Sequence, residues 1–174
     1  MKWNIDVTHS QAEFAVKHLM ISTVRGRFKT ISGFGESDAA GTLTNVSLDI
    51  DVASIDTNQQ QRDDHLRSAD FFDVANNPTM TFRSTAISQS GDDITITGDL
   101  TMKGVTKSVT LTGEYSSPVK DPWGNQRAAV NVSAKINRKD WGLEWNMALE
   151  TGGVVVSEEV KLSIEVQAVA EATA

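Results

Sequence analysis

The sequence predicts an all-β protein built from about eight antiparallel strands, with one short helix inserted near residues 58–68. Three observations predict this class. Apolar and polar residues alternate in many segments, which is typical of strands with one buried and one solvated face. Thr and Val are frequent in these segments and favour strands on steric grounds. The later connections are too short for crossover helices, which favours antiparallel pairing.

Two strands are expected near the start of the chain, at residues 12–18 and 26–34, where alternate residues share a face. The alternation is clearest at residues 46–52, whose sequence VSLDIDV places every apolar side chain on one side. Each of these segments is therefore expected to present one apolar face to the interior.

Residues 58–68 have no period of two and are rich in good helix formers, which predicts a helix between strands. A turn is expected at residues 69–73, and Pro78 marks the point where the sheet resumes. Five further alternating segments are each expected to form a strand, at residues 80–86, 94–102, 109–115, 128–136 and 160–166.

One apolar alternation has three open interpretations. Trp141, Leu143, Trp145, Met147 and Leu149 recur at every second position. They could form a core strand, a flap over the mouth of a cavity, or a dimer surface. Aromatic and methionine side chains beside a barrel mouth would suit a flexible apolar ligand, and they would equally suit packing.

Alternation alone does not choose between a barrel and a sandwich, since both architectures bury one face of each strand. A small barrel of about eight strands has an interior that is either filled by side chains or able to hold one small ligand. The functional question is which of these interiors the chain forms.

Length and composition restrict the function. A chain of 174 residues predicts one domain over residues 1–174. The net charge of −7 argues against nucleic-acid binding and against general attraction to anionic membranes, because both need a basic surface. No segment has the roughly 18 apolar residues of a membrane span. The start of the sequence has no apolar run of signal-peptide length, so the expected location is cytoplasmic, or periplasmic if the sequence is a trimmed form.

Residues that could carry catalysis are few. The chain has no Cys, no phosphate-binding glycine loop and no nucleophile elbow. His9, His18 and His65 are far apart and lack the spacing of a helical metal site. We therefore expect no enzyme, no metal and no catalytic cofactor. Two alternatives remain open: an enzyme with a polar pair such as His18 and Asp140 inside the barrel, and a filled barrel acting as a structural dimer.

The chain resembles the YceI-like family, lipocalin-like bacterial lipid-binding proteins often described as polyisoprenoid-binding. The resemblance covers nearly the whole chain and rests on the order and spacing of several short motifs. They are DVTHS at 6–10, VKHLMISTVRGRF at 16–28, HLRSADFFD at 65–73, NPTMTFRS at 77–84, GDLTMKGVTKSVTL at 98–111, INRKDWGL at 136–143 and SEEVKLSIEV at 157–166.

The resemblance implies an antiparallel β-barrel with an elongated apolar tunnel. The implied ligand is a long-chain amphiphile: a polyisoprenoid, an isoprenoid quinone or a fatty-acid derivative. The resemblance also implies a carrier or store, a homodimer, and no known catalytic residues.

The inward faces and nearby aromatic side chains provide the candidates for this tunnel. The tunnel candidates are Phe14, Val16, Phe28, Phe34, Ile50, Phe71, Phe72, Phe82, Leu100, Ile136, Trp141, Trp145, Met147 and Leu162. The head-group candidates, which offer hydrogen bonds near strand ends, are His18, Arg25, Asn137, Arg138 and Asp140. Arg25 and Arg138 could meet a phosphate or carbonyl, or they could pair structurally with nearby acids.

Overall fold

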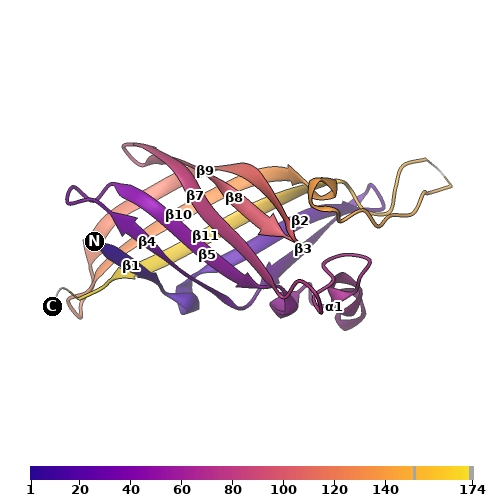
Figure 1. Ribbon diagram of the computed structural model, residues 1–174, viewed down its shortest axis with the longest axis horizontal. Helices are drawn as coiled ribbons and strands as arrows, with labels where there is room; N and C mark the ends of the chain where they lie inside the picture. Colours follow the sequence, from indigo (N-terminus) through magenta and orange to yellow (C-terminus); the bar gives the residue numbers. More distant parts are fainter. Residues whose placement is uncertain (151, 173–174) are drawn as a thin grey trace.

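In the computed structural model, which describes residues 1–150 and 152–172, the strands form one antiparallel sheet that closes on itself (Figure 1). Its strands are β1 (Lys2–Ile5), β2 (Gln11–His18), β3 (Ser22–Phe28), β4 (Ile31–Ser37), β5 (Leu43–Asp51), β6 (Ile55–Asp56), β7 (Thr79–Ser90), β8 (Asp93–Met102), β9 (Val105–Lys120), β10 (Gln126–Asn137) and β11 (Glu159–Ala170). The helical elements are α1 (Gln60–Arg67) and the 3₁₀ turns η1 (Val7–His9), η2 (Val52–Ser54) and η3 (Arg138–Trp141).

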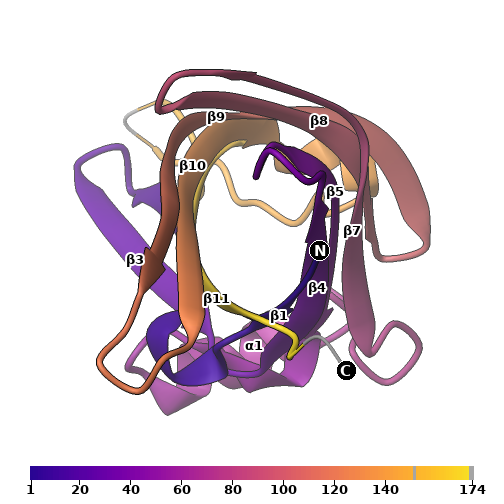
Figure 2. The same cartoon turned by 90° about the vertical axis from the view of Figure 1, so that its left-hand side faces the viewer.

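Eight strands make the closed barrel, in the order β1-β4-β5-β7-β8-β9-β10-β11, and β11 pairs with β1 to complete the ring. Figure 2 looks into this ring from one end. Trp3 of β1 joins the two edges, because it lies opposite Gly35 of β4 and opposite Ala170 of β11. The expected barrel is confirmed, and the sandwich alternative is excluded.

The remaining strands extend the sheet at the other end of the barrel. β2 continues along β11 beyond β1, β3 forms a hairpin with β2, and the two-residue β6 pairs with β3. The helix α1 lies at this same end (Figure 1). It confirms the helix expected at residues 58–68, with its ends at Gln60 and Arg67.

The single strand expected at residues 26–34 is wrong. The chain forms β3 up to Phe28, turns at residues 29–30, and begins β4 at Ile31. Phe28 and Ile31 are both buried, whereas the turn residues between them are exposed, so the inward-facing parity reverses across the turn. The strand at residues 46–52 also ends one residue early, since Val52 belongs to η2.

The core-strand interpretation of residues 141–149 is also wrong. Arg138–Trp141 form η3, and the chain then runs as a loop that projects past the end of the barrel (Figure 1). Trp141 and Leu143 are buried in the core, whereas Met147 is exposed. The apolar alternation here reflects packing at the start of the loop, without the backbone ladder of a strand.

Candidate functional site: an apolar cavity with a polar mouth

The barrel encloses a cavity of about 680 Å³ that runs along its length. This volume lies within the range of roughly 300–1,000 Å³ found for small-molecule sites. Most of its wall is apolar and comes from inward-facing residues of the strands. These include Phe14, Val16, Phe28, Leu48, Ile50, Met80, Phe82, Ile96, Leu100, Leu111, Val132, Ile136, Leu162 and Ile164.

One end of the cavity is closed by large buried side chains. Trp3 and Tyr115 both line the cavity and are almost fully buried. The indole N–H of Trp3 donates to the hydroxyl of Ser37 at 2.9 Å, and the Tyr115 hydroxyl donates to the carbonyl of Gly41 at 3.0 Å. Burial raises the pKa of the Tyr115 hydroxyl, so it stays a neutral donor. These two side chains therefore close the cavity at the end beside β1.

The opposite end, beside α1, is polar and open to solvent. Gln59 and Gln61 line the cavity and are exposed, and Arg62 of the same helix reaches the wall. Arg62 Nε donates to the hydroxyl of Thr57 at 2.8 Å, and its Nη2 donates to the Thr57 carbonyl at 2.7 Å. Thr57 in turn donates both its backbone N–H and its hydroxyl to the buried carboxylate of Asp63. This network fixes a cation at the mouth.

Aromatic rings gather around the mouth. The centroids of His65 and Trp145 lie 4.8 Å apart, those of His65 and Phe71 5.1 Å, and those of Phe71 and Trp145 5.4 Å. The two contacts of His65 are edge-to-face, an arrangement that aromatic pairs favour. His65 Nε2 also lies 2.9 Å from a carboxylate oxygen of Asp70, which orients the imidazole.

Arg138 is a buried cation that borders the same cavity. Its guanidinium donates to the carbonyls of Ser157 at 2.9 Å, Leu143 at 2.6 Å and Val156 at 3.3 Å. Its carbon Cζ lies 5.9 Å from the ring centroid of Phe71. Desolvation lowers the pKa of Arg138, yet an arginine keeps its charge in proteins. Arg138 therefore joins the loop after η3 to the wall of the cavity.

The structure brings two of the five head-group candidates to the cavity. His18 and Arg138 line it, whereas Arg25, Asn137 and Asp140 do not. Arg25 is exposed on β3, on the face opposite to Val24 and Gly26. Asn137 accepts a hydrogen bond from the backbone N–H of Lys139 at 3.0 Å, which caps η3, and Asp140 is exposed.

Three tunnel candidates are misplaced. Trp141 lies behind the wall, where its indole N–H donates to the carbonyl of Leu100 at 3.0 Å. Met147 is exposed on the loop. Phe34 borders the cavity, but its pairing with Asn4 places its ring on the outer face of the barrel. There Lys2 Nζ lies 5.2 Å from the ring centroid. The other tunnel candidates all line the cavity.

Sequence reasoning missed most of the mouth. Thr57, Gln59, Gln61, Arg62 and His65 all line it, and none was a tunnel or head-group candidate. One signal was present: Arg62 and His65 are three residues apart, a spacing that places two side chains on one face of a helix.

Residues 1–150 and 152–172 contain no group of three His, Cys, Asp or Glu side chains placed to hold a metal ion. No helix in this part of the chain is long and apolar enough to cross a membrane.

A closed antiparallel barrel around one apolar cavity with a polar mouth places the chain among barrels built to hold a ligand rather than to be filled by side chains. The model of the YceI-like domain matches residues 3–168, and the chain belongs to this family. The protein YceI of Escherichia coli is 41% identical over 164 residues, which cover 92% of this chain and 82% of that protein.

Solved structures agree with the fold. The YceI protein of Campylobacter jejuni is 32% identical, with a TM-score of 0.79 over 90% of each chain. A domain from Saccharophagus degradans, described as polyisoprenoid binding, has a TM-score of 0.72 over 97% of this chain and 98% of that one. At 19% identity this second likeness shows the fold alone.

Proposed function

We propose that the protein binds one long-chain amphiphile, with its tail in the cavity and its head group at the mouth beside α1. The observation that carries this proposal is the cavity itself, which is apolar along its length, closed by Trp3 and Tyr115 and polar at the other end. The ligand class is a polyisoprenoid, an isoprenoid quinone or a fatty-acid derivative, and the role is that of a carrier or store. The description of the Saccharophagus degradans domain agrees with this class.

Energetics favour a long tail over a strongly held head group. Burial of a CH₂ group contributes about 0.8 kcal/mol, whereas association costs roughly 4–15 kcal/mol. A ten-carbon tail would contribute about 8 kcal/mol before these costs and would barely bind. A tail of several isoprene units exceeds the cost without any strong polar contact. The length of the cavity is therefore expected to select the ligand more strictly than the mouth does.

The mouth supplies donors for a head group that carries acceptor oxygens. Arg138 uses three of its N–H groups on backbone carbonyls, and a guanidinium has five. Two therefore remain for a phosphate, carboxylate or quinone oxygen. Arg62 and His65 are already held by Thr57 and Asp70. These groups can hold a head group by hydrogen bonds, and we propose a binding protein rather than an enzyme.

Extraction of the purified protein with organic solvent, followed by mass spectrometry, tests the proposal. A matched pair of variants on β10 sharpens the test. Val132→Trp adds a large side chain to the cavity wall, and Lys135→Trp adds the same side chain to the exposed face. We expect an amphiphile to co-purify with the wild type and with Lys135→Trp, and much less with Val132→Trp. A wild-type protein that contains no lipid and takes up no added long-chain amphiphile would refute the proposal.

The expected homodimer stays a prediction that light scattering can test. The dimer-surface interpretation of residues 141–149 finds little support at Trp145, because this side chain faces the cavity.

A further inference from the structure

The turn between β2 and β3 ends in apolar side chains that face solvent. Leu19, Met20 and Ile21 are exposed by 38%, 56% and 82% of their surface. Met147, exposed by 59%, lies on the loop beside this turn. The backbone connects the two, since Val155 donates to the Met147 carbonyl at 3.0 Å and accepts from the Leu19 N–H at 2.8 Å. We call these four exposed side chains the apolar tip.

The backbone of the turn makes these residue types unusual. Leu19 and Met20 have φ values of 54° and 64°, and the Ile21 N–H donates to the His18 carbonyl at 3.2 Å. Hairpin turns with two positive φ values strongly prefer Asn-Gly, because a Cβ atom is strained in this region. Folding alone would favour other residues here, which indicates that the apolar side chains serve another purpose.

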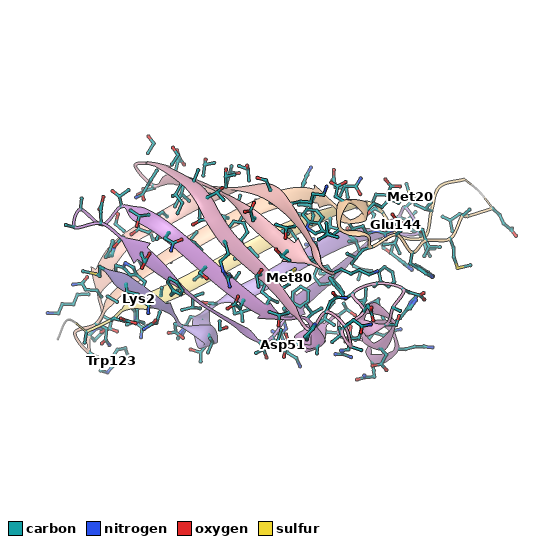
Figure 3. The ribbon with its side chains drawn as sticks, in the orientation of Figure 1. Lys2, Met20, Asp51, Met80, Trp123 and Glu144 are labelled. Carbon is teal, nitrogen blue, oxygen red and sulfur yellow. The ribbon has the colours of Figure 1, made fainter. Side chains whose placement is uncertain are left out.

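The apolar tip adjoins the mouth of the cavity. His18 lines the cavity and directly precedes the tip, and Val155 and Val156 line the cavity where the loop meets the turn. Met20 lies at the end of the molecule beyond α1 (Figure 3). The exposed Trp123, on the turn between β9 and β10, lies at the opposite, closed end (Figure 3).

We propose that the apolar tip inserts into the surface of a lipid bilayer and holds the mouth of the cavity against the membrane. This inference rests on the proposed function, because an amphiphilic cargo resides in membranes and must pass between bilayer and barrel. A tip that projects from the molecule needs no complementary pocket in a fluid bilayer. Brief, reversible docking is sufficient for loading or release.

The size of the tip favours a membrane over a second copy of the chain. Its four residues together expose little more than the surface of two full residues, whereas a stable protein interface draws on roughly 20–30 residues a side. A stable protein interface buries about 800 Å² on each partner. The tip is too small for such an interface, whereas shallow insertion gains free energy from each buried side chain.

The charges near the tip predict which membrane it binds. Lys17 precedes the tip, and the exposed Glu144 lies at the same end of the molecule (Figure 3). These opposite charges, together with the net charge of −7, give no attraction to anionic lipid. We therefore expect docking on neutral phosphatidylcholine surfaces, with little dependence on salt.

Sedimentation with phosphatidylcholine vesicles tests the proposal. The double variant Leu19→Asn, Met20→Gly gives the turn its preferred residues, so its melting temperature should be equal to or above that of the wild type. Its partition onto vesicles should fall roughly ten- to hundredfold, because about one side chain's worth of exposed apolar surface is lost. Trp123→Ser removes an exposed apolar side chain at the closed end and should partition like the wild type.

Three outcomes would overturn the proposal: a wild type that does not sediment, a double variant that sediments equally well, or an equal loss in Trp123→Ser. A double variant that sediments equally well but has a smaller mass by light scattering would identify the tip as a contact between copies. The vesicles carry no added isoprenoid, and co-purifying lipid is measured separately. A lipid-filled protein that does not bind vesicles therefore refutes docking alone. A protein that docks but contains no lipid and takes up no added long-chain amphiphile refutes the proposed function alone.

Discussion

Replacing Arg138 by alanine should destabilise the protein strongly, although its neighbour Lys139 should tolerate the same change. The Arg138 side chain donates to three carbonyls, and among the described residues only that of Val156 has another side-chain donor, Nδ2 of Asn146 at 2.7 Å. Arg138→Ala therefore leaves the carbonyls of Leu143 and Ser157 without this partner. An unsatisfied buried group costs about 1–3 kcal/mol. The bond to the Leu143 carbonyl is buried and that to the Ser157 carbonyl is partly buried, which predicts a loss of roughly 1–4 kcal/mol.

The control is well matched. Lys139 forms an ion pair with Glu158 at 2.8 Å, and both side chains are nearly half exposed. Such surface pairs contribute up to about 1 kcal/mol, so Lys139→Ala should lose no more than this. Urea denaturation measures both free energies of unfolding. Hydrogen exchange should locate the Arg138→Ala effect at the Leu143 and Val156 amides, where the loop meets the barrel. Equal losses in the two variants would refute the assignment of Arg138 as the anchor of the loop.

Two further predictions concern the barrel wall. Gly98→Val should cost roughly 1–3 kcal/mol or more in urea denaturation, because a Cβ at this position would lie 2.5 Å from the carbonyl oxygen of Arg83 and 2.5 Å from Cζ of Phe82, and both must move. A neutral effect would contradict this packing. Arg127 holds the pKa of the Asp121 carboxyl well below its usual range through a hydrogen bond at 2.8 Å. The unfolded carboxyl takes up its proton near pH 4, so this stability is present above about pH 4 and lost as the pH falls. Arg127→Met should therefore flatten the acid side of a plot of melting temperature against pH, and an unchanged slope would contradict it.

The strands were largely predictable because a barrel buries one face of each, and burial imposes a period of two on the sequence. The period of two does not predict the structure correctly in two places. β1 is only four residues long and shows too little alternation to detect, yet it closes the ring. Residues 141–149 alternate without forming a strand. Part of the loop's hydrogen bonds go to the side chains of Arg138 and Asn146, and its backbone pairs only locally, around an isolated bridge between Ala148 and Val154 in the described residues.

The wall of the cavity was more predictable than its mouth. Alternation also shows which residues face inward: Phe14, Val16 and His18 share a face of β2, and the parity of β3 puts Arg25 on the other face. Phe34 was misassigned because the turn before β4 reverses that parity. The mouth depends on how α1 lies against the end of the barrel, and no local pattern in the sequence specifies this docking.

The cavity itself has a cause in the sequence that alternation does not reveal. An eight-stranded barrel is just wide enough for large side chains to fill. Here several inward positions carry small residues: Ala128 and Ala168 both line the cavity, and they lie directly opposite each other on β10 and β11. Ala12 lines the wall where β2 pairs with β11. Large side chains at such positions would fill the interior. The cavity therefore depends on the size of the inward-facing residues. Hydrophobicity alone predicts only that these positions face inward.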